Sequence, residues 1–124
     1  ADVSELAIFD VDAKRCGELI TRLQEFYGDR VKAGSSDPTG FELVVNATPM
    51  GMRPEDPFPV QVEKLSPEAF AACVITAPAV SPWIEAARKK GCRTSVGIDM
   101  YKAEQNLMLE FFLQALGNAS TASA

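Results

Sequence analysis

The sequence predicts an α/β domain built on a doubly wound parallel sheet. Its apolar residues fall in short continuous runs, as in strands that helices cover on both faces. Amphipathic helical segments separate most of these runs, and one run, at 43–45, ends abruptly in a small polar loop containing Pro and Gly. At 124 residues, with 47% apolar residues, the chain is long enough for one domain with a real core.

The chain opens with a predicted strand and helix. Residues 6–9 are an apolar run that ends at Asp10. Over 13–27, apolar residues recur at spacings of three and four while charged residues take the other face, which predicts an amphipathic helix. Asp12 is expected to cap this helix and Gly28 to end it.

The middle of the chain is organised around residues 42–52. We expect a short strand at 30–33 and a loop at 34–40, where Gly, Ser and Pro cluster. Residues 43–45 then suit a buried strand, and the small polar residues, Pro and Gly that follow suit a tight turn. Open α/β sheets bind ligands at such carboxyl ends of their strands.

The second half predicts further alternation after an irregular connection. Residues 50–58 are rich in proline and are expected to be irregular and mobile, and 60–65 to form a turn. The expected elements that follow are a short helix at 66–70, a strand at 72–76, a helix at 81–90, a strand at 93–96 and a long helix at 99–116. The two earlier helices each begin with a Ser-Pro pair, which supplies a cap and then a first-turn proline. We expect the domain to span 1–117 and to leave a frayed, disordered tail at 118–124.

Composition excludes several classes of function. The net charge is −5 with mixed signs, so a nucleic-acid surface is not expected. No apolar run reaches membrane-spanning length and no signal peptide opens the chain, so a cytoplasmic protein without a membrane partner is expected. The chain has no histidine, and Cys16, Cys73 and Cys92 are far apart, which disfavours a metal site or a catalytic triad and favours reduced, buried thiols.

Three short motifs carry a family resemblance. They are Val-Asn-Ala-Thr-Pro-Met-Gly-Met at 45–52, Ser-Pro-Trp-Ile-Glu-Ala-Ala at 81–87, and Gly-Ile-Asp-Met at 97–100 with Gln105 after it. In sequence and order they resemble the C-terminal NAD(P)-binding domain of the shikimate/quinate dehydrogenase family. The resemblance covers nearly all of 5–116. It implies a Rossmann-like fold and reversible, NAD(P)-dependent oxidation of a ring hydroxyl of shikimate or a related hydroxy acid, within aromatic amino acid biosynthesis.

One part of such a domain is missing from the sequence. No Gly-x-Gly-x-x-Gly turn occurs, nor the first strand that precedes it. In the strand order 3-2-1-4-5-6 that strand is central, so 6–9 and 43–45 are left with unpaired apolar edges. We therefore expect the missing N-terminal segment, or another chain, to complete the sheet.

The resemblance also places the catalytic residues elsewhere. In this family a Lys and an Asp of an N-terminal substrate domain handle the proton, and no segment of this chain corresponds to that domain. The chain alone is therefore expected to be inactive. The alternative is a non-catalytic, truncated α/β module that binds a nucleotide, or a protein through its open sheet edge.

Cofactor choice is expected to depend on the end of the strand at 6–9. An acid there, Asp10, accepts hydrogen bonds from ribose hydroxyls and repels a 2′-phosphate. NADP-using relatives resemble Asn-Arg-Thr-x-x-Arg at this place, whereas here Val11 replaces the first Arg and Arg15 keeps the second. With Asp12 as a second acid, NAD is favoured over NADP. Alternatively, Asp10 is only a turn residue and Asp12 only a helix cap.

The resemblance implies further cofactor contacts. Asn46, Ala47 and Thr48 would line the cofactor between ribose and nicotinamide, and Val74 would lie near the nicotinamide. Gly97 would let the backbone approach the carboxamide. Each position also suits a simple turn after a strand. Elsewhere, Met50 and Met52 suit packing on a cofactor ring or packing in the core or a loop, and the second is favoured. Trp83 is expected to anchor a core or an interdomain contact.

The substrate side departs from the family pattern. A family Tyr falls on Thr76, and a family Gln, four residues after Met100, falls on Glu104, with Gln105 one position later. A carboxylate beside an anionic substrate is unfavourable unless it stays protonated or a cation intervenes. A related polyol or quinate-like substrate, or a divergent paralogue, is therefore as plausible as shikimate. Alternatively, Glu104 and Gln105 are solvated residues of a long helix.

Overall fold

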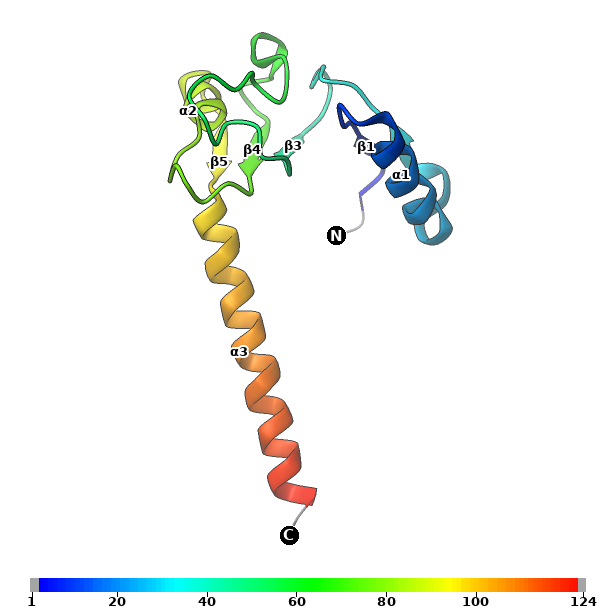
Figure 1. The fold of residues 1–124 in the computed structure, drawn as a ribbon, viewed down its shortest axis with the longest axis vertical. Coiled ribbons are helices and arrows are strands. Elements are labelled where there is room, and N and C mark those ends of the chain that lie inside the picture. Colours follow the sequence, from blue (N-terminus) through cyan, green and yellow to red (C-terminus); the bar gives the residue numbers. More distant parts are fainter. Residues whose placement is uncertain (1–2, 123–124) are drawn as a thin grey trace.

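The computed structural model describes residues 3–122 and resolves them into strands, helices and two single 3-10 turns (Figure 1). The strands are β1 Leu6–Ile8, β2 Val31–Ala33, β3 Leu43–Asn46, β4 Phe70–Cys73 and β5 Arg93–Ser95. The helices are α1 Ala13–Tyr27, α2 Pro82–Lys89 and α3 Gly97–Ala122, with 3-10 turns η1 Gly28–Arg30 and η2 Val62–Lys64. Figure 1 shows α3 extending away from the rest of the chain.

The strands form two parallel sheets, one with β1 and β2 and one in the order β3-β4-β5. Read as β2-β1, a gap, then β3-β4-β5, this is the order 3-2-1-4-5-6 without strand 1. No strand among residues 3–122 fills that gap. The parallel α/β class predicted from the sequence is confirmed. One face of β3 is apolar and uncovered, since Leu43 and Val45, which point to the same face of the sheet, are 54% and 51% exposed.

Helix α1 forms for the predicted reasons but remains only partly covered. The Asp12 carboxylate accepts a hydrogen bond from the Arg15 N–H, and Gly28 ends the helix with a φ of 57°. No residue of α1 is fully buried, and Leu19 and Phe26 are 44% and 77% exposed. A two-stranded sheet is too small to cover the apolar side of a helix of this length.

The core lies between α2 and the three-stranded sheet. Its most buried members are Leu65, Ala71, Trp83, Ile84 and Ala87. Trp83 is fully enclosed, as predicted for a core anchor, and its indole N–H has no hydrogen-bond partner among the described residues. This half of the molecule is therefore the better-packed one.

Two sequence expectations are wrong around β4. The predicted helix at 66–70 is a turn, in which the Ala69 N–H donates to the Ser66 carbonyl, and β4 begins directly at Phe70. The strand therefore covers 70–73 instead of 72–76. A Ser-Pro pair initiates turns as readily as helices, and the Ala-Ala pair inside β4 gives no β-branched signal for a strand.

The C-terminal region also differs from expectation. Helix α3 continues to Ala122, so residues 118–122 are helical and not a frayed tail; 123 and 124 lie outside the described residues. Every residue from 98 to 118 is exposed. No helix within 3–122 combines the length and apolar character that crossing a membrane requires.

Candidate functional site

The turn after β3 is held together by the side chain of Asn46. This residue is only 3% exposed. Its Oδ1 accepts hydrogen bonds from the Thr48 N–H at 3.1 Å and the Thr48 hydroxyl at 2.6 Å. Its Nδ2 donates to the Met50 carbonyl at 2.9 Å and toward the Cys73 sulfur at 3.5 Å. The Asn46 amide is thus engaged within the chain and shapes the turn.

A hollow of about 290 Å³ lies at the carboxyl ends of β3 and β4. Residues 47–49 and Met52 form one side, and 74–77 form the other. Four predicted site residues therefore lie together, although Ala47 and Thr48 are almost thirty positions before Val74 and Thr76 in the sequence. The walls are mainly apolar, which suits a flat ring with few polar contacts.

Gly97 lies beside this hollow and is required by contact within the chain. A Cβ added there would lie 2.2 Å from the Ile75 carbonyl oxygen and 2.6 Å from that of Val74. The first turn of α3 thus presses against the backbone that follows β4. The turn itself is fixed because the Asp99 carboxylate accepts a hydrogen bond from the Val96 N–H at 3.0 Å.

Asp10 lies at the end of β1, in the other sheet, and does not line the hollow. Its Oδ1 accepts a hydrogen bond from the Asp12 N–H at 2.9 Å. The Arg15 guanidinium lies 4.0 Å from the Asp10 carboxylate and 3.7 Å from that of Asp12. The turn and cap roles of the two acids are both realised. A ribose contact by Asp10 stays a prediction.

The predicted substrate residues divide between two places. Thr76 lines the hollow, whereas Met100, Glu104 and Gln105 lie on exposed α3 and do not line it. The Gln105 side chain donates to the Tyr101 hydroxyl at 3.2 Å, within its own helix. Met52 also lines the hollow, although packing in the core or a loop was favoured for it over a cofactor contact.

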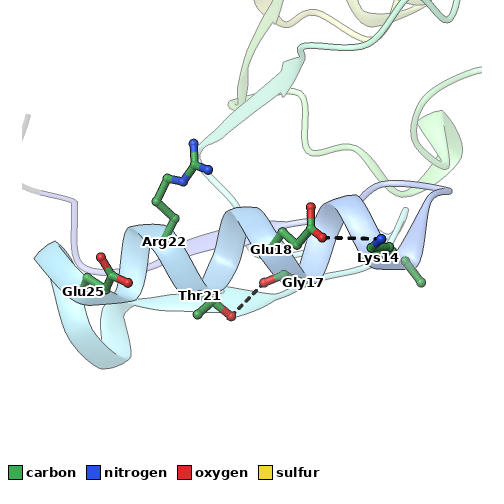
Figure 2. Close-up of a pocket in the computed structure, with 7 residues that line it drawn as sticks. Lys14, Gly17, Glu18, Thr21, Arg22 and Glu25 are labelled. Atoms are coloured by element: carbon green, nitrogen blue, oxygen red, sulfur yellow. Dashed lines mark hydrogen bonds and ion pairs between the residues drawn. The ribbon is translucent and has the colours of Figure 1, made fainter.

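A second hollow, on α1, does not have the character of a site (Figure 2). All seven lining residues, from Ala13 to Glu25, belong to that one helix. Lys14 pairs with Glu18 at 3.9 Å, and the Thr21 hydroxyl donates to the Gly17 carbonyl at 2.9 Å. One helix face cannot surround a ligand. Among residues 3–122, no cluster of His, Cys, Asp or Glu could hold a metal ion.

Known proteins resemble the chain over limited lengths. No protein-family model matches it. It is 32% identical over 91 residues to the shikimate dehydrogenase (NADP(+)) of Afipia carboxidovorans, covering 69% of this chain and 33% of that protein. The chain spans between 21% and 34% of the length of the curated relatives it matches.

Two solved structures share the fold with a TM-score of 0.70 each. One is the quinate dehydrogenase of Corynebacterium glutamicum in complex with NAD, 28% identical, which covers 80% of this chain and 37% of its own. The other is the 5-ketofructose reductase of a Gluconobacter species, 26% identical, which covers 79% of this chain and 38% of its own.

The strand order and the hollow at the strand ends define the chain as part of a Rossmann-like α/β domain. Its sequence and structural relatives narrow that class further. The chain belongs to the shikimate/quinate dehydrogenase family and corresponds to part of its NAD(P)-binding domain.

Proposed function

We propose that this chain is the NAD-binding portion of an oxidoreductase that reversibly oxidises a ring hydroxyl of shikimate or a related hydroxy acid. One observation carries the proposal: the motif at 45–52 forms, with the end of β4, a hollow at the carboxyl edge of a parallel sheet. That edge is where open α/β sheets bind ligands.

The residues of the hollow suit the nicotinamide end of the cofactor. Ala47 and Val74 offer apolar surface to a flat ring, and Thr76 offers a hydroxyl at the rim. Asn46 acts indirectly, by fixing the turn that carries Thr48. When bound, the cofactor accepts or returns the hydride; this chain's part is to hold and orient its ring.

The residues that would bind the pyrophosphate of the cofactor are not found among those described. The phosphates of a dinucleotide normally lie at a helix N-terminus after a glycine-rich turn. No such turn occurs in residues 3–122, and the gap between β1 and β3 is where its strand belongs. We infer that another segment, of a longer protein or of a separate chain, fills the gap and brings this turn. The catalytic Lys and Asp would come with that segment.

Preference for NAD over NADP rests on Asp10 and Arg15. The Arg15 guanidinium lies within 4.0 Å of two carboxylates, so it is a poor partner for a 2′-phosphate. Asp10 itself would repel that phosphate. The relative from Afipia is named for NADP(+) and the quinate dehydrogenase structure contains NAD, so the family includes both choices.

The substrate class is broader than shikimate alone. Glu104 stands where the family pattern has Gln, which disfavours an anionic substrate group nearby. Structural relatives named for quinate and for 5-ketofructose support a hydroxylated substrate other than shikimate. Glu104 is exposed on α3 and would approach the substrate only when the further segment inferred above completes the domain.

Calorimetry of the 124-residue chain with NAD, NADP and ADP tests the proposal. We expect weak binding of NAD, with a dissociation constant of about 1 mM or above because the pyrophosphate lacks its helix N-terminus, and weaker binding of NADP. With NAD and shikimate we expect no turnover; measurable turnover would refute the placement of the catalytic pair outside this chain. Absence of any nucleotide binding would instead favour a protein-binding module that uses the open edges of β1 and β3.

A further inference from the structure

The segment after the Asn46 turn is irregular but is tied down by one carboxylate. Asp56 Oδ2 accepts hydrogen bonds from the Gly51 N–H and the Arg53 N–H, each at 3.0 Å. The Asp56 N–H donates back to the Arg53 carbonyl at 3.1 Å. One side chain therefore closes the loop from both ends.

The residue held between these two contacts is Met52. Its N–H donates to the Pro49 carbonyl at 3.1 Å, and both residues line the hollow. Gly51, next to it, is buried with a φ of 99°, and a Cβ there would be in contact with Ser81 and Ile75. The wall is thus anchored on the core side by Gly51 and on the solvent side by Asp56.

The electrostatics of Asp56 agree with this contact. The Arg53 N–H, and after it the Gly51 N–H, stabilise the charged carboxylate and hold the pKa of Asp56 below its usual range. Charge-assisted hydrogen bonds of this kind are stronger than neutral ones. Pro54 and Pro57 flank the carboxylate and restrict the backbone further.

We propose that Asp56 is a positioning residue of the cofactor site: it holds the 49–53 turn so that Pro49 and Met52 form one wall of the hollow. The inference rests on the proposed function, because the ring that this wall would contact is that of the nicotinamide. A methionine suits such a wall, since its flexible thioether adapts to a flat ring once its backbone is fixed.

Three variants of the full chain test the role of Asp56. Asp56→Ala removes the acceptor, and Asp56→Asn keeps the shape but loses the charge. Glu55→Gln is the matched control, because Glu55 is exposed and makes no hydrogen bond or ion pair within residues 3–122. The measurements are amide hydrogen exchange, urea unfolding followed by Trp83 fluorescence, and NADH affinity by titration.

For Asp56→Ala we expect exchange at Gly51 and Arg53 to rise about tenfold and NADH affinity to fall about fivefold, with an unchanged unfolding midpoint. For Asp56→Asn we expect exchange rates and NADH affinity between those of Asp56→Ala and the unaltered chain. Glu55→Gln should match the unaltered chain in both measurements. Faster exchange with unaltered NADH affinity would show a merely structural role for Asp56 and overturn the inference. Unchanged exchange would also overturn it, because Asp56 would then not hold the turn. Failure of the unaltered chain to bind NADH would overturn the proposed function itself and the inference with it.

Discussion

Substitution of Gly97 by alanine should destabilise the three-stranded half of the molecule. The new Cβ would lie 2.2 Å from the Ile75 carbonyl oxygen and 2.5 Å from its carbon, so α3 or the backbone just after β4 must move by about 0.8 Å to restore even a 3.0 Å contact. Both partners are backbone atoms, and β4 is the central strand of its sheet. Overpacking of this kind costs about 1–3 kcal/mol, and the rigidity here places the effect near 3 kcal/mol.

Urea unfolding followed by Trp83 fluorescence measures this loss, because Trp83 is fully buried in the affected half. At a slope of about 2 kcal/mol per M, the midpoint should fall by about 1.5 M. Gly17→Ala is the control: an added Cβ there meets nothing within 4 Å, and alanine favours the α1 helix. A Gly97→Ala midpoint within about 0.3 M of the unaltered chain would refute the close approach.

Three further predictions concern single polar side chains. Lys64, and after it Thr39, lower the pKa of Asp37 to about 2, below its unfolded value, so its stabilising effect is present above about pH 4 and is lost as the pH falls toward 2. Asp37→Asn should therefore shrink the loss of stability between pH 5 and pH 2.5 in urea titrations, and an equal loss in both proteins would contradict this. Asn46→Ala should lower the free energy of unfolding by about 2 kcal/mol, because Thr48 and Met50 lose part-buried hydrogen bonds to its side chain, whereas Asn106→Ala, at an exposed helical position, should leave it unchanged or raise it slightly. Asp10→Asn should lower the ratio of the dissociation constants for NADP and NAD by about tenfold in calorimetry. An unchanged ratio would show that Asp10 does not determine cofactor choice.

The sequence was sufficient to predict the elements whose signals are local. The helix α1 follows from its 3.6-residue periodicity and the Asp12 cap, and β3 from a short apolar run. The start of β4 was missed because Ser66 and Pro67 initiate a turn and a helix equally well, and the choice depends on pairing with β3 and β5. Such pairing is a long-range property that local propensity does not contain.

The site shows the same division. The motif at 45–52 lies at the strand end where the structure has a hollow, and the family resemblance named Val74 and Thr76, which line the other side of that hollow. The role of Asp56 could not be predicted, because it depends on a loop conformation that brings its carboxylate to Gly51 and Arg53. Likewise, the steric need for Gly97 arises from contact with the backbone of Val74 and Ile75, just after β4 and more than twenty residues earlier in the chain.

Titration of NAD into the isotope-labelled chain, followed by the shifts of its backbone amide signals, shows whether the hollow binds the nicotinamide. We expect millimolar NAD to perturb amides around the hollow, at Ala47, Thr48, Val74 and Gly97, and ADP, which lacks the nicotinamide, to leave them unchanged. No perturbation by about 10 mM NAD, or perturbation confined to the outer face of α1, would contradict the assignment of the β3–β4 edge as a nicotinamide site.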